Sequence, residues 1–193
     1  MNRHQLSIAA VLLLALVPAQ AQVRRHDPLT AKEVEDLREV AQDPAQRLKL
    51  YARYALARMT AIDQVRADSK LATAERAKQL HDLIEDLGTI VDEMDDNVED
   101  YDKRKADLRR PLKDVIEADT ALQIKLRALK EAADTTLAKE APDFRFALEN
   151  TVESVNQSAQ AARETLEAQN VAFAKAKADE KAKAKEAKDK RNH

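Results

Sequence analysis

The stretch LHDLIEDLGTIVDEMDDNVEDY, residues 80–101, decides the fold. Its apolar residues recur at alternating steps of four and three, and they are Leu80, Ile84, Leu87, Val91, Met94, Val98 and Tyr101. This spacing places them along one stripe of an α-helix that packs against other helices at a shallow angle. The sequence therefore predicts a long helix over 71–104 that buries one face.

Four further segments carry helix signals. A capping box formed by Thr30 and Glu33 begins a short helix over 31–41. Asp43 and Pro44 begin a helix over 44–67 as N-cap and first residue, and its inward residues are Leu48, Tyr51, Ala55, Met59 and Ile62. Pro111 opens a helix with the stripe Leu112, Val115, Asp119, Leu122, Leu126, Leu129 and Ala133. Pro142 precedes a last helix over 143–190, with Gln169 as the one polar residue among Leu148, Val152, Val155, Ala159, Ala162, Leu166 and Phe173.

The composition agrees with helices throughout. The chain has one glycine, five prolines, 3% aromatic and 35% charged residues, which is typical of long helices and coiled coils. Because each helix is apolar on one stripe, and short connections make sequential helices antiparallel neighbours, we expect an all-α fold. It is an elongated, coiled-coil-like, up-down-up-down four-helix bundle with a short N-terminal and a long C-terminal helix. The stretch 65–76 has no glycine or proline, and Asp68-Ser69 is its only turn-like signal. Residues 44–104 could therefore form one helix, so three long helices are the alternative.

Residues 1–21 have the features of a secretory signal peptide. Arg3 precedes an apolar run of about a dozen residues, and Ala19-Gln20-Ala21 offers a cleavage site. The run is shorter than the ~20 residues of a transmembrane helix. We therefore expect a periplasmic or secreted protein, cleaved after Ala21, with no transmembrane segment in the mature chain. Its parts are a leader over 22–30, a bundle over 31–173 and a charged tail over 174–193.

The charge balance does not indicate a nucleic-acid binder, which normally has a basic surplus. Loss of residues 1–21 removes one cation and no anion, so the formal charge goes from −2 to −3. The tail over 174–193 carries eight cations and four anions, with high helix propensity and nothing to bury. It is either an extension that aids solubility or a basic arm for a protein, an anionic envelope polymer or a lipid surface. A homo-oligomer is also considered.

The acidic run within 82–102 holds ten acids and no cation. Most of these acids fall off the apolar stripe, which favours a solvated face that the cations of 103–113 partly neutralise after the chain folds back. A helix-loop-helix calcium site would need a tight glycine turn, and the stretch 91–105, which holds seven of these acids, has neither glycine nor a loop signal. His81 and Glu85, one turn apart, are weak metal-ligand candidates, and the others are Asp92, Asp95, Asp96 and Glu99. A partly exposed His81 without a metal is the favoured interpretation, and no cofactor is predicted.

Asp119 is the one carboxylate inside a leucine stripe, where it is costly unless it is paired or reaches solvent. It is interpreted as a device that sets helix register, with an interior ligand site as the alternative and Arg58 as a candidate partner. Gly88 in mid-helix predicts a bend or a close helix approach. A single glycine excludes Gly-rich phosphate loops and the Gly-x-Ser-x-Gly elbow, and we expect no enzymatic activity.

The segment LTAKE, residues 29–33, resembles the Leu-Thr-x-x-Gln motif of small periplasmic stress chaperones, which are exported, cysteine-free and helical. Glu33 replaces the glutamine of the motif, and no second copy of it is present, so the chain is not assigned to that family. In architecture it is similar to trimeric outer-membrane-protein chaperones, whose strong basic charge it lacks. The sequence favours a non-catalytic bundle that binds macromolecules, with a chaperone-like or scaffold role, or self-assembles. A metal- or small-ligand-binding bundle of the envelope-sensor type is the alternative.

Overall fold

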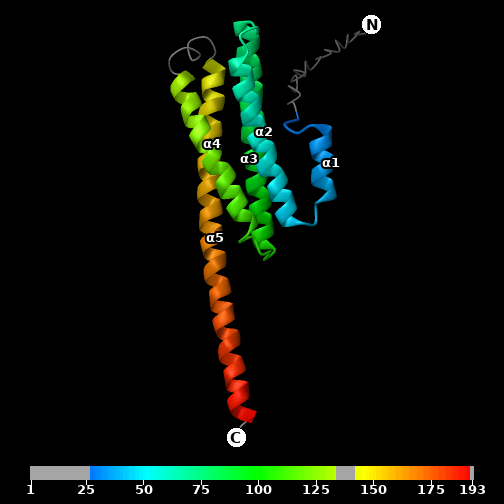
Figure 1. Ribbon diagram of the computed structural model, residues 1–193, viewed down its shortest axis with the longest axis vertical. Coiled ribbons are helices and arrows are strands. Elements are labelled where there is room, and N and C mark those ends of the chain that lie inside the picture. The colour runs from blue at the N-terminus through cyan, green and yellow to red at the C-terminus, as the bar shows by residue number, and fades with distance from the viewer. Residues whose placement is uncertain (1–26, 134–141, 192–193) are drawn as a thin grey trace, which may run out of the picture.

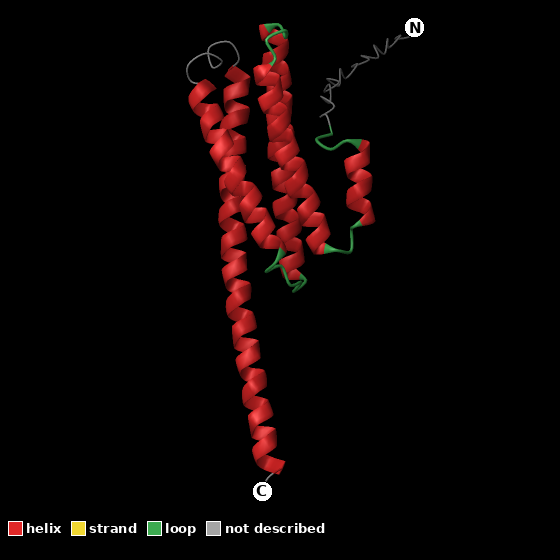
Figure 2. Ribbon diagram, in the orientation of Figure 1, coloured by secondary structure: helices red, strands yellow, loops and turns green. Residues whose placement is uncertain are grey.

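The computed structural model describes residues 27–133 and 142–191, where the chain is helical and contains no strand (Figure 2). The helices are α1 (Ala31–Glu39), α2 (Pro44–Ala67), α3 (Thr73–Lys103), α4 (Pro111–Ala133) and α5 (Pro142–Arg191). The all-α prediction is confirmed. Because α2 and α3 are separate helices, the alternative of three long helices is wrong. The predicted signal peptide over 1–21, with its cleavage site, lies outside the described residues.

The turn between α2 and α3 is held by its own polar groups. The Asp68 carboxylate accepts a hydrogen bond from the Lys70 N–H at 2.8 Å, an arrangement by which aspartate side chains stabilise turns. The Arg76 guanidinium, one turn into α3, donates to the carbonyls of Asp68 at 2.6 Å and Leu71 at 3.0 Å. These bonds satisfy backbone groups that a continuous helix would have paired, so the chain reverses without glycine or proline.

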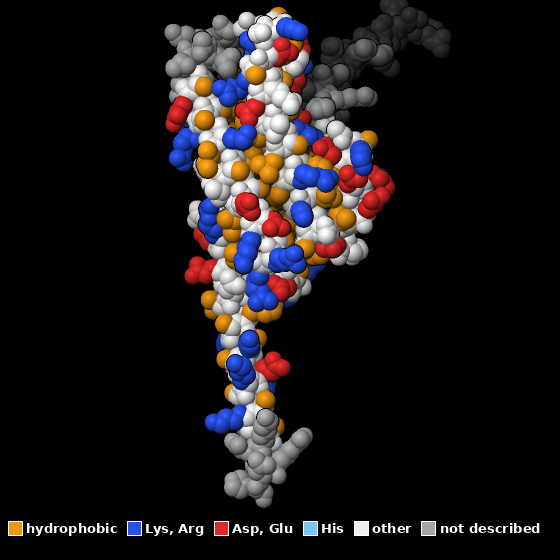
Figure 3. All heavy atoms as spheres, in the orientation of Figure 1, with side chains coloured by type: hydrophobic (Ala, Val, Ile, Leu, Met, Phe, Trp, Pro, Cys, Tyr) orange, Lys and Arg blue, Asp and Glu red, His pale blue; other side chains and the backbone are white. Residues whose placement is uncertain are grey.

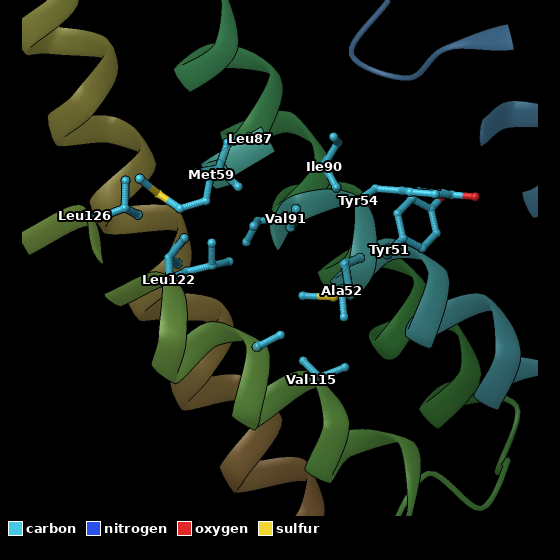
Figure 4. Close-up of a cluster of buried hydrophobic side chains, with 14 of the residues drawn as sticks. Tyr51, Ala52, Tyr54, Met59, Leu87, Ile90, Val91, Val115, Leu122 and Leu126 are labelled. Carbon is cyan, nitrogen blue, oxygen red and sulfur yellow. The ribbon is translucent and has the colours of Figure 1, made fainter. Parts of the chain in front are cut away.

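The predicted apolar stripes meet in one core. All seven stripe residues of α3 are buried, as are the five inward residues of α2. Figure 4 shows side chains of α2, α3 and α4 converging, with Met59 directed toward Leu122 and Leu126. Met59 and Met94 are 1% and 0% exposed, and both serve as core packing.

The four long helices form a ring in which α2 packs on α3, α3 on α5, α5 on α4 and α4 on α2 (Figure 1). Within the described residues α3 and α4 do not pack directly on one another. They lie diagonally across the bundle although only 104–110 separate them. The expectation that every pair of sequential helices would be neighbours is therefore wrong at this connection.

Hydrogen bonds between helices give their relative directions. The pairs Ile84 with Thr151 and Asp102 with Gln169 advance together along α3 and α5, which therefore run parallel. Asp119 bonds to Ser158, whereas Gln123, later in α4, bonds to Asn156, earlier in α5. Consequently α4 is antiparallel to α5.

The diagonal crossing of 104–110 is anchored by Gln169 of α5. Its side-chain oxygen accepts from the buried N–H of Leu108 at 2.8 Å. Its amide nitrogen donates to Asp102 at 2.8 Å and to the Ala106 carbonyl at 3.0 Å. Lys105 adopts a left-handed conformation with φ 62° at the end of α3, which turns the chain across the bundle.

Gly88 marks a close approach between α3 and α5. A Cβ atom at this position would lie 2.9 Å from the Thr151 hydroxyl oxygen, closer than van der Waals contact allows. That hydroxyl in turn donates to the Ile84 carbonyl at 3.0 Å. Of the two interpretations of Gly88, the close helix approach is the one observed.

The last helix continues far beyond the bundle. Gln169 is the last buried residue among the described side chains of α5, and Phe173, predicted as part of the stripe, is 41% exposed. The stripe therefore ends one turn earlier than predicted. Residues 170–191, called the arm from here on, extend for about 33 Å at 1.5 Å per residue (Figure 1). No described helix is both long and apolar enough to cross a membrane.

Candidate functional site

The arm has a basic face. Lys177, Lys181 and Lys185 are four residues apart and therefore share one side of α5. All three are exposed, and none has an ion-pair partner within the described residues. Figure 3 shows lysines spaced along the arm with few acids between them. This face is available to an anionic partner without first breaking an existing salt bridge.

A groove lies at the root of the arm. Its lining includes Arg109, Asn170, Phe173, Lys177 and Glu180, and it has a volume of about 650 Å³. The Arg109 guanidinium stacks over the Phe173 ring at 3.4 Å from its centroid, a cation–π contact. Phe173 remains partly exposed, so the groove combines an aromatic surface with the cations Arg109 and Lys177.

Asp107 keeps Arg109 in place over the ring. Its two carboxylate oxygens accept from Arg109 Nε at 2.9 Å and Nη2 at 2.7 Å. These hydrogen bonds lower the pKa of Asp107 to about 2. The bidentate pair therefore remains intact at neutral pH and orients the guanidinium plane.

The acids of α3 differ in their surroundings, since some form ion pairs and others are exposed without a partner in the part of the chain that the structure describes. Glu99 and Asp100 pair with Lys103 and Arg104, one turn later on the same helix, whereas Asp92 and Asp96 are exposed and unpaired in the described structure. The predicted neutralisation is therefore local, within the last turn of α3, rather than between antiparallel helices.

The metal-ligand candidates do not come together. His81 Nδ1 lies 3.5 Å from Asp82 and 3.8 Å from Glu85, and its side chain is 28% exposed on the flank of α3. Asp95 turns inward while Asp92, Asp96 and Glu99 lie toward solvent, at least partly exposed. Across residues 27–133 and 142–191, no three histidine, cysteine or acidic side chains are placed to hold a metal ion.

Arg58 does not meet Asp119, contrary to the pairing considered from the sequence. The Arg58 guanidinium instead binds α1 and the leader. It donates to both Glu33 carboxylate oxygens at 3.0 and 2.6 Å and to the Pro28 carbonyl at 2.7 Å. Burial raises the pKa of Glu33, but the bonds from Arg58 and Thr30 outweigh it and leave that pKa lowered. Glu33 thereby joins the predicted capping box of α1 to α2.

Asp119 belongs to a polar cluster in the core. Its side chain is 0% exposed, and its Oδ2 accepts from the Ser158 hydroxyl of α5 at 3.1 Å. The Asp95 carboxyl of α3 is the second neighbour of Ser158. Burial, with a smaller contribution from the Asp95 charge, raises the pKa of Asp119 to about 7. Burial also raises the pKa of Asp95.

Sequence reasoning missed the polar residues of α5 that reach into the bundle. Thr151 and Ser158 are buried beside the apolar stripe, and Gln169 was noted only as a polar interruption of it. Their spacing of seven and eleven residues is itself helical. That periodicity could have placed them on the inward face, although it could not have named their partners.

Comparison of the chain with protein-family models, with curated proteins and with solved structures finds no match. The arm presents three exposed lysines without ion-pair partners in the described residues along one face of α5. Such a face can bind anions electrostatically, and the groove at its root adds an aromatic surface.

Proposed function

We propose that this chain is an exported, non-catalytic binding protein whose helical bundle holds a cationic arm away from its body so that the arm can bind an anionic lipid surface. The observation that carries the proposal is the arm's basic face of Lys177, Lys181 and Lys185, exposed and unpaired. A rigid helix presents these charges in a fixed order without the ordering cost that a disordered tail would have.

The charge distribution supports the same function. Residues 174–193 carry a net charge of +4, so the segment from 22 to 173 carries −7. An anionic surface therefore attracts the arm and repels the body. Apart from Asn170, Val171 and Phe173 at its root, the arm is built of alanine and charged residues. Its binding is therefore electrostatic and does not insert into the lipid.

Reversal of the basic face is expected to abolish this binding. Each lysine near an anionic membrane contributes about 1 kcal/mol, so Lys177→Glu, Lys181→Glu and Lys185→Glu together lower partitioning by about 100-fold or more. The measurement is co-sedimentation of the chain without residues 1–21 with vesicles of phosphatidylglycerol and phosphatidylcholine, at low and at high salt. Deletion of 174–193 is expected to have a comparable effect.

The matched control reverses three exposed lysines on the body, with Lys49→Glu, Lys113→Glu and Lys130→Glu. It changes the net charge by the same amount and is expected to reduce binding much less. Equal loss in both triple variants would attribute binding to net charge and contradict a role for the arm. Binding to a soluble polyanion without binding to vesicles would replace lipid as the partner.

A further inference from the structure

The cluster of Asp95, Ser158 and Asp119 joins three helices, with Asp119 and Ser158 buried and Asp95 partly buried. Asp95 comes from α3, Asp119 from α4 and Ser158 from α5. Because α3 and α4 are diagonal, the two carboxyl groups approach one another across the core, with Ser158 beside both. The charges of this cluster therefore act between α3 and α4, which do not pack directly on one another.

The cluster has too few hydrogen-bond donors to satisfy two ionised carboxylates. A serine hydroxyl has one hydrogen to donate, and Ser158 donates it to Asp119 Oδ2. Asp119 Oδ1 and Asp95 Oδ1 are buried and lack a hydrogen-bond partner in the described structure. Two ionised carboxylates would thus face each other in a low-dielectric interior with two oxygens unsatisfied.

The surrounding charges do not compensate for this deficit. Among the residues that the structure describes, the cation that acts on Asp119 is Arg163 of α5, whose side chain is exposed. The charges that act on Asp95 from its own helix are Asp92, Asp96 and Glu99, all negative. No residue of α2 is among the charges that act on Asp95 or Asp119. A single proton shared by the pair removes both the repulsion and one buried charge.

We propose that Asp95, Ser158 and Asp119 form a buried proton-binding site that holds α3, α4 and α5 together when one proton is bound and weakens their packing when that proton is lost. The bound proton lets one carboxyl donate a hydrogen bond as well as accept one. Its loss places two like charges on diagonal helices and drives these helices apart.

The direction of the pH effect follows from proton linkage. The pKa of Asp119 is about 7 in the folded chain, against 3.8 when it is unperturbed. Between these values the folded protein retains a proton that the unfolded chain has released, so stability falls as pH rises through this window. The raised pKa values of Asp95 and Glu93 act in the same direction.

Thermal unfolding between pH 5.5 and 8.5, followed by circular dichroism on the chain without residues 1–21, tests the site. We expect the wild-type Tm to fall by on the order of 10 °C over this range. Asp119→Asn is expected to remove most of the fall and to be more stable than wild type at pH 8.5. Asp114→Asn, an exposed position on the same helix, serves as the control and should keep the wild-type slope. Glu93→Gln measures the separate contribution of Glu93.

Carboxyl NMR of the wild type and of Ser158→Ala tests the site directly. Carboxyl NMR of ¹³C-aspartate-labelled protein should show one buried aspartate titrating near pH 7, and its absence would overturn the site. Ser158→Ala removes a bond to the charged form and should move that titration to higher pH. Equal slopes for wild type and Asp119→Asn would also overturn it. A calcium-dependent rise in Tm at pH 8.5 that Asp119→Asn abolishes would replace the proton by a cation.

Discussion

Replacing Gln169 by leucine is expected to lower the free energy of unfolding by about 3–5 kcal/mol. The change removes three hydrogen bonds and leaves the N–H of Leu108, which is 0% exposed, without an acceptor. Each buried group left unpaired costs about 1–3 kcal/mol. Urea unfolding at pH 6 measures the loss, and hydrogen exchange at the Leu108 amide should accelerate more than in the rest of the core.

Two matched variants separate this role from the general effect of a polar-to-apolar change. Gln160→Leu alters an exposed glutamine of the same helix, bonded only to Glu164 one turn away, and is expected to stay within about 0.5 kcal/mol of wild type. Gln169→Glu keeps the acceptor for Leu108 but loses the donor and faces the Asp102 carboxylate. It should be destabilising at pH 7 and less so at pH 4. Equal stability of Gln169→Leu and Gln160→Leu would show that the crossing of 104–110 does not depend on Gln169.

Leu122→Ala is the second large effect expected. Leu122 is 0% exposed and lies beside Met59 and Leu126 in the core (Figure 4). Truncation of a fully buried leucine costs about 2–5 kcal/mol, since it loses transfer free energy and leaves a cavity. The measurement is urea unfolding, with the slope of the transition compared to confirm that the folded state is the same.

Ile124 provides the control on the same helix. It lies two residues further on and is 66% exposed, so Ile124→Ala should change stability by less than about 0.5 kcal/mol. Comparable losses at both positions would mean that α4 is rotated about its axis relative to the arrangement described. The pair of variants therefore tests the orientation of the helix that carries Asp119.

The helix starts were predictable because each has a local chemical cause. Thr30 and Glu33 form the capping box, with bonds of 3.3 and 2.8 Å, and the Asp43 carboxylate caps α2 by accepting from the Gln46 N–H at 3.1 Å. Proline begins α2, α4 and α5. These interactions involve residues within four positions of each other, and the free backbone groups of a helix terminus select them whatever the rest of the fold does.

The candidate sites were less predictable because they depend on distant residues. Arg58 was considered as a partner for Asp119, yet its partners are Glu33, Pro28 and Asp86, from α1, the leader and α3. The partner of Asp119 is Ser158, 39 positions later. The period of a stripe tells which residues face inward, but long-range pairing depends on which stripes meet and on how far each helix is displaced along its axis.

The sequence by itself determined that the chain is helical, where four of the helices begin, and which faces are buried, because capping and 3.6-residue periodicity are local properties. Only the tertiary structure decided that α3 and α4 lie diagonally and that α5 packs on both of them. The physical reason is that an apolar stripe packs almost equally well against either neighbour. Specific polar contacts, from Gln169 to 104–110, from Thr151 to α3 and from Ser158 to Asp119, are satisfied in this one arrangement.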